Sequence, residues 1–425
     1  MLTILKIAGL IFEQFASLLL NEFFWIIVLI MILVYKKNTN MEAMMLNSSY
    51  SLLHKASSSV TVGLAGGLLG SLMAILVGIS IADYTGAGES SLAEGITYIW
   101  IVAILLAFIN PRYLCFSYSG GIICLMNLMF GFPRINVPGL LALIGVLHLI
   151  ESFLIWLDGY TYSLPMFLRR HDGKIIGGYY MNKIWPIPLV VFAIMLSSEG
   201  AGASPDSIIN MPDWWPLLKH SAAQGDTLMY LPLVVPVILG YGDIAITKAP
   251  EKKCRSSAAR LAGYSLILVL LSVIASKLRP LAYAAAVFAP LAHEMLILYG
   301  TKEEETGKPY FANKETGLKV LHVKKGKAAD NMKIEPGDTI LGINGIAIYS
   351  EEQLTDFLDN RPSYIWLDIE KAEDGIITVE HSNYPDGVGD LGVITVPRNG
   401  DFYYEINRGR SPIKKIVSLF KKDAK

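Results

Sequence analysis

The feature that most constrains this chain is a series of long apolar runs that fills its first 300 residues. A helix needs about 20 apolar residues to cross a bilayer, because lipid cannot hydrogen-bond exposed backbone groups. The sequence therefore predicts a polytopic α-helical membrane bundle over residues 1–300, with nine candidate spans: Glu13–Tyr35, Ser58–Ile81, Ile96–Asn110, Tyr113–Phe132, Val137–Leu157, Ile184–Ser198, Leu228–Ile246, Arg260–Ser276 and Pro280–Leu298. The third and sixth are short, and Tyr113–Phe132 carries Gly120, Gly121 and Asn127, which suit a re-entrant segment. Eight transmembrane helices are therefore the alternative.

Lysine and arginine are unevenly distributed between the polar stretches that separate these runs. Short cytoplasmic loops carry an excess of both residues. One alternating set of loops holds thirteen of them and the other set only five. This bias predicts an external N-terminus and a cytoplasmic C-terminal region. The richer set comprises Lys36, Lys37, Lys55, Arg112, Arg169, Arg170, Lys174, Lys183, Lys248, Lys252, Lys253, Arg255 and Arg260.

The second apolar run carries two small-residue motifs. Gly63 and Gly67 form one Gly-x-x-x-Gly motif, and Gly66 and Gly70 form the other. Small residues let helix backbones approach closely. The motifs predict close packing within the bundle, with a homodimer seam as the alternative.

From Thr301 the composition becomes that of a soluble domain. The whole chain is 53% hydrophobic and only 17% charged, against about 25% charged in a typical protein, and charged residues concentrate here. Alternating apolar residues begin at Leu318, and Ser350 is a good N-cap for a helix over Glu351–Asp359. Pro336-Gly337 and Asn344-Gly345 suit tight turns. We predict a small α+β domain over residues 301–405.

This domain resembles a bacterial PDZ domain over Gly317–His381. The most specific part is the run EPGDTILGINGIAI at 335–348, which a helix follows. The resemblance implies a cytoplasmic domain that binds an extended peptide or a C-terminus by strand addition. Leu354 and Phe357 would belong to the helical wall of its groove.

The second wall of the groove is less obvious in the sequence. PDZ domains seat a terminal carboxylate on a glycine-containing loop that leads into the docking strand, and no such loop directly precedes Gly317. The downstream segment GVGDLGVITV at 387–396 has this pattern. A permuted strand order would place Leu391, Gly392, Val393 and Ile394 in the groove. The alternative is an extra hairpin on the sheet.

Residues 406–425 form a basic tail. Ile413, Ile416, Val417 and Phe420 recur at helical spacing, and the other faces hold Lys414, Lys415, Lys421 and Lys422. This pattern predicts an amphipathic helix on anionic lipids of the inner leaflet. A solvated tail is the alternative.

Two protease patterns are incomplete. His293-Glu294 begins a zinc-protease motif, but Ile297 occupies the position of its second histidine. The run 240–243 matches the Gly-x-Gly-Asp of intramembrane aspartyl proteases, in which two carboxylates share a proton. Asp158 and Asp243 would form that dyad. Both lie at the ends of predicted spans, where a solvated carboxylate costs little.

The remaining groups give no basis for catalysis or metal binding. His148 and Glu151 share a helical face, as paired metal ligands can, but Cys115, Cys124 and Cys254 have no metal-ligand spacing. The formal net charge of −1 does not indicate nucleic-acid binding. We therefore predict no enzyme, no metal and no cofactor, with the Asp158–Asp243 protease as the alternative.

Four strings in the membrane half, followed by the PDZ-like domain, resemble the MinJ-type membrane PDZ proteins of Gram-positive bacteria. They are HLIESFLIWLDG at 148–159, PMFLRRHDGKIIGGYYMNKIWPIPL at 165–189, LGYGDIAIT at 239–247 and HEMLI at 293–297. The resemblance extends over about Val137–Val396. MinJ-type proteins are topological determinants of cell division, held to bridge the coiled-coil protein DivIVA to the Min system through MinD. The resemblance implies DivIVA-like and MinD-like partners, enrichment at septa or poles, and a cytoplasmic loop at Phe167–Lys183 that either contacts partners or only sets topology.

The sequence as a whole predicts a multi-pass scaffold of the cell membrane that recruits division or polar proteins. Two alternatives stay open. One is a PDZ adaptor in secretion or envelope signalling, and the other is an intramembrane aspartyl protease whose PDZ domain admits substrates.

Overall fold

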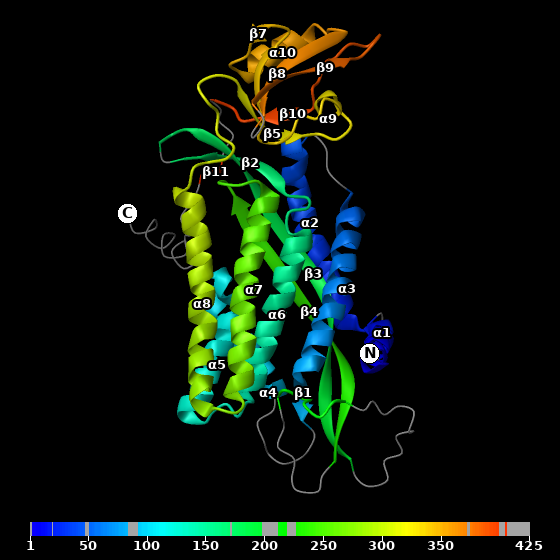
Figure 1. Cartoon of the computed structure of the whole chain (residues 1–425), viewed down its shortest axis with the longest axis vertical. Helices are drawn as coiled ribbons and strands as arrows, with labels where there is room; N and C mark the ends of the chain where they lie inside the picture. The colour runs from blue at the N-terminus through cyan, green and yellow to red at the C-terminus, as the bar shows by residue number, and fades with distance from the viewer. Residues whose placement is uncertain are drawn as a thin grey trace, which may run out of the picture.

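The structure is a computed structural model that describes residues 2–18, 20–46, 51–83, 92–170, 172–197, 211–218, 227–371, 375–398 and 404–405. Figure 1 shows an elongated molecule whose body is built of long helices beside a long β hairpin. A small α/β domain lies at one end of this body. The helices are α1 Leu2–Leu18, α2 Glu22–Leu46, α3 Leu52–Val77, α4 Leu92–Ile109, α5 Phe116–Phe130, α6 Val137–Asp158, α7 Pro250–Ala275 and α8 Arg279–Thr306.

Fewer helices are long enough to cross a bilayer than the sequence predicted. Within the described ranges four qualify by length and composition, namely α3, α6, α7 and α8. The first predicted span is divided into α1 and α2, which meet at a bend and add at most one more. The described residues therefore do not form the eight or nine helical spans that the sequence predicted.

Helices α4 and α5 are short. Their apolar parts, Gly95–Ile109 and Phe116–Phe130, rise only about 22 Å each at 1.5 Å per residue, against a hydrocarbon core of about 30 Å. The 3₁₀ turn η1, Pro111–Leu114, joins them. This length suits a helical hairpin that enters the bilayer and returns to the same side.

Two predicted spans are strands and not helices. β3, Ile175–Ser197, pairs with β4, Thr227–Ala245, in an antiparallel hairpin from Tyr179↔Ala245 to Ser197↔Thr227. Helical assignments for Ile184–Ser198 and Leu228–Ile246 were therefore wrong. The physical reason is that each run contains two prolines, which remove backbone donors and clash inside a helix. These are Pro186, Pro188, Pro232 and Pro236.

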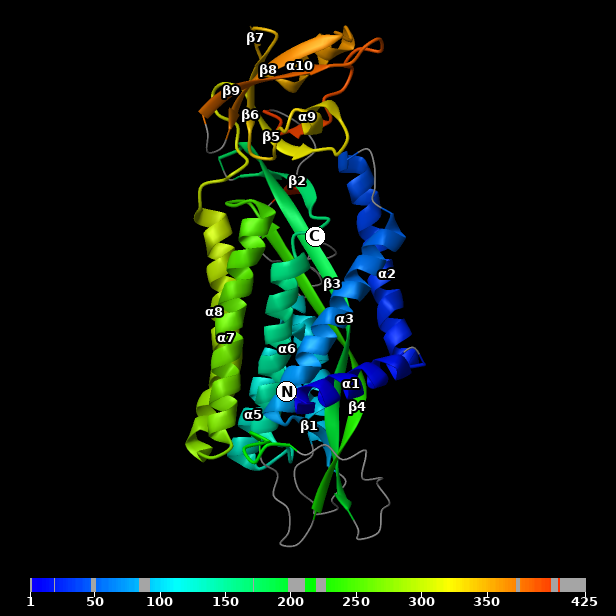
Figure 2. The ribbon, with the colours of Figure 1, turned by 45° about the vertical axis from the view of Figure 1, so that its right-hand side comes forward.

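Helix α3 covers the edge of β3 that faces away from β4 (Figure 2). The Val190 amide donates to Ser71 Oγ over 2.8 Å, and the Ile184 amide donates to Tyr35 OH over 3.2 Å. A Cβ atom on Gly63 would lie 2.2 Å from the Pro186 carbonyl oxygen, and one on Gly67 would lie 2.4 Å from that of Pro188. Side chains of α2 and α3 thus bond to amides on this edge of β3, and glycines of α3 leave room for its carbonyl groups. Lipid could not hydrogen-bond these backbone groups.

The second small-residue face of α3 packs against α6. A Cβ atom on Gly66 would meet Leu154, and one on Gly70 would meet Ile150. Both glycine motifs are therefore used for contacts within the chain, as the first interpretation predicted. They do not provide the homodimer seam that was the alternative.

The remaining strands of the body extend the hairpin's sheet. β1, Ser80–Asp83, and β2, Leu164–Arg169, both pair with β3, and β11, Tyr404–Glu405, pairs with β2. The turn between β2 and β3 is closed by a bond from the Arg170 amide to the Lys174 carbonyl oxygen over 3.0 Å. The loop predicted at Phe167–Lys183 thus contains the turn of a hairpin.

The C-terminal domain has a core of its own. Its sheet has the order β10-β5-β6-β8-β9, with β7 paired to β6, and its helices are α9 and α10. Ser350 caps α10 by accepting from the Gln353 amide at 3.3 Å, and the predicted bounds of that helix are confirmed. The elements are β5 Leu318–Val323, α9 Ala328–Asn331, β6 Thr339–Ile343, β7 Ile346–Ala347, α10 Glu351–Asp359, β8 Tyr364–Lys371, β9 Gly375–Ser382 and β10 Val393–Thr395.

Candidate functional site

The predicted docking strand lies at one end of the C-terminal sheet. β10 pairs antiparallel with β5 through Val393↔Val323 and Ile394↔His322. This is the arrangement that a permuted strand order requires, in which the last strand of the domain stands beside its first. Its neighbour in sequence, β9, lies at the opposite end of this sheet. Peptide binding at β10 stays a prediction.

The loop that leads into β10 is held in place by three hydrogen bonds, two between backbone groups and one to a side chain. The Gly392 amide donates to Asp390 Oδ1 over 2.7 Å, and the Gly392 carbonyl accepts from the Lys324 amide over 2.7 Å. The Leu391 carbonyl accepts from the Ala329 amide over 2.9 Å. Because backbone groups alternate in direction along a strand, the Val393 amide faces the outer edge of the sheet.

Glycine is required at position 392. Its φ angle is +74°, and a Cβ atom there would lie 2.2 Å from Lys327 Cβ. Left-handed backbone and the close approach of a neighbouring side chain both exclude other residues. This requirement explains the glycine in the loop independently of any ligand.

Helix α10 and the loop before β10 share one apolar core. Leu354 and Leu391 are almost fully buried in it, whereas Phe357 and Val393 lie at its margin and keep some exposure. Ile394 packs instead against the core of the body. Four of the six predicted groove residues thus belong to one core, namely Leu354, Phe357, Leu391 and Val393, whereas Ile394 faces the junction with the body.

The β2–β3 hairpin carries the C-terminal domain. The Gly177 amide donates to the Phe311 carbonyl over 2.7 Å, and the Tyr179 hydroxyl donates to the Leu321 carbonyl. A Cβ atom on Gly177 would lie 2.7 Å from Leu321 Cδ1. Phe311, Leu321 and Val396 are fully buried in the same core as the body. The domain is therefore docked on the hairpin, and the predicted loop surface at Phe167–Lys183 is partly used for this contact.

His322 lies at this junction, opposite Ile394 of β10. Its Nδ1 is 3.4 Å from the Tyr179 hydroxyl. Burial, with a smaller contribution from Lys324, lowers the pKa of His322 from 6.5 to about 4. The imidazole is therefore neutral at physiological pH, and acid would place a charge in the junction.

Asp158 is buried at the end of α6, where it binds groups of β3. It accepts from Lys183 Nζ over 3.1 Å and from Trp185 Nε1 over 2.8 Å, and Thr161 also donates to it. The ion pair joins the helical layer to the hairpin. The Asp158 side chain thus has partners on both of its oxygens.

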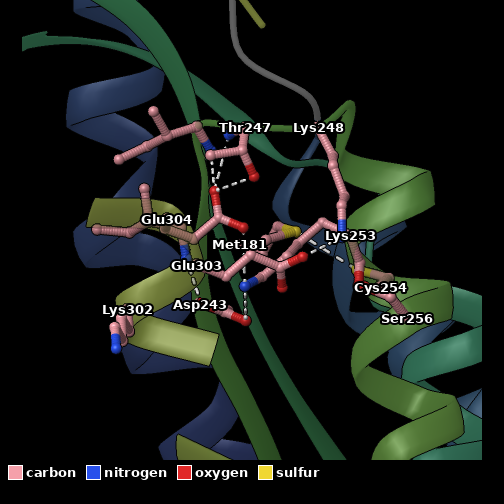
Figure 3. Close-up of polar contacts among 12 residues, drawn as sticks. Met181, Asp243, Thr247, Lys248, Lys253, Cys254, Ser256, Lys302, Glu303 and Glu304 are labelled. Atoms are coloured by element: carbon pink, nitrogen blue, oxygen red, sulfur yellow. Dashed lines mark hydrogen bonds and ion pairs between the residues drawn. The ribbon is translucent and has the colours of Figure 1, made fainter. Parts of the chain in front are cut away.

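Asp243 lies on β4 and belongs to a separate network (Figure 3). Lys253 Nζ is 3.3 Å from Asp243 Oδ2 and 3.0 Å from Glu304 Oε1. Glu304 Oε2 also accepts the amides of Ile246 and Thr247, each over 2.8 Å. The network ties the start of α7 and the end of α8 to the end of β4.

These contacts argue against the aspartyl protease. Asp158 is paired with Lys183 and Asp243 with Lys253, and within the described contacts the two carboxylates do not bond to each other. A proton shared between the aspartates, which that chemistry needs, has no basis here. The Gly-x-Gly-Asp run also lies on a strand, not on a helix.

Sequence reasoning missed a cavity of about 520 Å³ inside the body. Glu151, Asp243, Arg260 and His293 are among the residues that line it. Beside it, Cys115, His148 and His293 come together from three separate segments. No motif spacing could have indicated this cluster, because its members lie 33 and 145 residues apart in the chain.

The predicted membrane-surface residues lie outside the described ranges. These are Lys414, Lys415, Lys421 and Lys422 of the tail at 406–425. The lipid-binding helix remains a prediction.

The fold and the docked domain define a class: a membrane protein with an apolar helical body and an α/β domain at one end. No family model matches the chain. The chain is similar to the cell division topological determinant MinJ of Bacillus subtilis, with 23% identity over 259 residues. The match covers 61% of this chain and 62% of MinJ, so the chain spans about three fifths of that relative. The predicted resemblance to MinJ-type proteins is confirmed.

Proposed function

We propose that this chain is a non-enzymatic membrane scaffold that recruits proteins to the division site or cell pole. In this proposal the C-terminal domain works as a permuted PDZ domain and binds an extended peptide or a C-terminus. The antiparallel position of β10 beside β5, next to α10, is the observation that carries the proposal. The similarity to a cell division topological determinant supports the cellular process.

The chemistry of recognition is strand addition. A peptide beside β10 bonds to the outward backbone groups of Val393 and Thr395, and its alternate side chains face α10 near Phe357. In the loop Asp390–Gly392 the Gly392 amide is bonded to Asp390 Oδ1, so a terminal carboxylate would have to displace that side chain to reach it. Ordering a peptide costs entropy, so affinity depends on how rigidly this edge is held. The three loop bonds described above provide that rigidity.

The partners are placed on the cytoplasmic side in this proposal. Segments of the basic-rich loop set lie at the end of the body that carries the domain, including the start of α3, the β2–β3 hairpin end and the start of α7 (Figure 1). This distribution supports a cytoplasmic domain. DivIVA-like and MinD-like proteins are then the partner classes, and the basic tail adds contact with anionic lipids.

A matched pair of proline substitutions tests the proposal. Val393→Pro removes an outward donor of β10 and leaves the bonds between β10 and β5 intact, because proline is tolerated at sheet edges. Ile376→Pro makes the same change at the opposite edge, on β9, where Ile376 is 67% exposed. Both are introduced into the full chain as a fluorescent fusion at native level in dividing cells.

We expect septal or polar enrichment for the unmodified chain and for Ile376→Pro. Val393→Pro should stay in the membrane but lose at least half of its enrichment. Uniform membrane signal from the unmodified chain would refute the division role. Full enrichment of Val393→Pro would refute recruitment through the β10 edge.

A further inference from the structure

The strongest unassigned feature is the cluster of Cys115, His148 and His293 in the body. Cys115 Sγ lies 3.1 Å from His148 Nε2 and 3.6 Å from His293 Nε2, and the three ligand atoms all lie within 4.8 Å of one another. A tetrahedral zinc ion, with Zn–S of about 2.3 Å and Zn–N of about 2.0–2.1 Å, holds sulfur and nitrogen about 3.5 Å apart. The observed spacing fits one ion between the three atoms.

The lone pair of His148 Nε2 is directed at the cluster, because the other ring nitrogen carries the hydrogen. His148 Nδ1 is 2.8 Å from the Ile144 carbonyl oxygen, so Nδ1 carries the hydrogen of the neutral ring. Backbone carbonyls play the same role behind metal-bound histidines. Nε2 is then an acceptor.

The nearby hydroxyl does not supply a hydrogen to Nε2. Ser117 Oγ lies 3.2 Å from His148 Nε2 and 2.8 Å from Tyr264 OH. Tyr264 donates its single hydrogen to the Ala289 carbonyl over 3.0 Å. It must therefore accept from Ser117, which uses the only hydrogen that Ser117 has. Among the described residues, a weak S–H donor from Cys115 is all that remains for Nε2.

His293 also has a ring nitrogen that lacks a hydrogen-bond partner among the described residues. Its Nδ1 is buried and has no hydrogen-bond partner within the described part of the chain, and its Nε2 points to Cys115. Buried nitrogens without partners are rare in proteins. The neighbouring Glu294 is held by Arg112 and the Tyr118 hydroxyl, so it does not compete for the cluster.

We propose that Cys115, His148 and His293 bind a transition-metal ion, with Zn²⁺ as the best fit to one thiolate and two imidazoles. This site is independent of the proposed peptide binding. A three-ligand site leaves a fourth position open. Glu151 can occupy it directly or through water, because its Oε2 is 4.0 Å from His148 Nε2 and it lines the cavity together with His293.

The ion would act as a clamp in the body. Cys115 directly precedes α5, at the tip of the short α4–α5 hairpin, whereas His148 and His293 belong to the long helices α6 and α8. One metal ion would therefore pin the hairpin tip to two spans. The cavity gives the ion and its water a route to the site.

The test uses the full chain, purified in detergent without a histidine tag and treated with chelator. Co²⁺ serves as a spectroscopic probe, followed by competition with Zn²⁺. We expect one ion per chain and a near-ultraviolet thiolate-to-cobalt band that Zn²⁺ abolishes. Cys115→Ala should remove the band and weaken Zn²⁺ binding at least about 100-fold. Cys124→Ala, within α5 and outside the cluster, is the matched control and should keep both.

Two outcomes would overturn the proposal. The first is an unmodified chain that elutes as folded protein but binds less than stoichiometric Co²⁺. The second is a thiolate band that persists in Cys115→Ala or is lost equally in Cys124→Ala. His293→Gln provides a second variant with the cysteine intact, and it should lose Zn²⁺ affinity to a similar degree.

Discussion

The helices α6, α7 and α8 and the hairpin β3–β4 are similar in hydropathy but opposite in structure. All were predicted as helical spans. Away from their ends, the helices satisfy nearly all backbone groups internally, whereas a strand must find partners for both of its edges. In the hairpin, β4 serves one edge of β3. Strands β1 and β2 pair with the ends of the other edge, and residues of α2 and α3 bond to its middle. Hydropathy therefore measures preference for an apolar setting and does not determine backbone structure.

The two regions differ in how densely prolines occur, since α8 holds one interior proline, Pro290, whereas each strand of the hairpin holds two. Pro186 and Pro188 direct their carbonyl groups at the glycines of α3, so their missing amides fall on the edge that does not pair with β4. Pro236 stands opposite Pro188 and so has the same orientation toward its own outer edge. A helix would lose a bond at each proline, and the strands lose none of their ladder.

The ion pair between the two regions should give the largest effect. Lys183→Met leaves Asp158 buried without its cation, and we expect a loss of about 3–5 kcal/mol of unfolding free energy. Adding Asp158→Asn should recover most of this loss, because the uncompensated charge is then gone. Unfolding of the full chain in detergent by denaturant measures both. A double variant no more stable than Lys183→Met would show that the pair does not join hairpin and helices.

Glycine in α3 provides the next test. Gly63→Leu forces a side chain into the Pro186 carbonyl, and we expect a loss of about 3 kcal/mol, the upper range for overpacking. Gly263→Leu is the matched control in α7, where a Cβ atom would meet nothing within 4 Å. It should be neutral or gain up to about 1 kcal/mol from helix propensity. Equal losses in a thermal unfolding assay would contradict the close contact between α3 and β3.

The junction above the hairpin should be sensitive to acid. Because the folded pKa of His322 lies near 4 and its ordinary value is 6.5, the unfolded state binds more protons between these values. The contribution of His322 to the free energy of unfolding is then fully present above pH 6.5 and declines as the pH falls toward 4. We expect a loss of about 2 kcal/mol between pH 7 and pH 5, measured by hydrogen exchange of β5 and β6 amides in the full chain. His322→Gln should remove this pH dependence of stability. If the dependence is unchanged in that variant, another group causes it.

The sequence was sufficient for those parts of the molecule whose signals are local. The helix over Glu351–Asp359 follows from its cap at Ser350, and the turn at 170–174 follows from a short polar run between apolar ones. The hairpin was missed because a long apolar run outweighed the prolines in it. The Cys115–His148–His293 cluster could not be predicted, since only the packing of α5, α6 and α8 brings these residues together.

The smallest expected effect concerns a single hydroxyl at the strand edge. Ser71→Ala leaves the buried Val190 amide without a partner, and we expect a loss of about 1–2 kcal/mol. Ser272→Ala is the matched change in α7, where the hydroxyl bonds only to the Leu268 carbonyl of its own helix. That carbonyl keeps its helical partner, so the control should cost less than about 0.5 kcal/mol. Denaturant unfolding of the two variants compares them directly. If both substitutions cause the same loss of unfolding free energy, the edge of β3 does not depend on α3 for its hydrogen bonds. The contrast between the two regions then fails at this position.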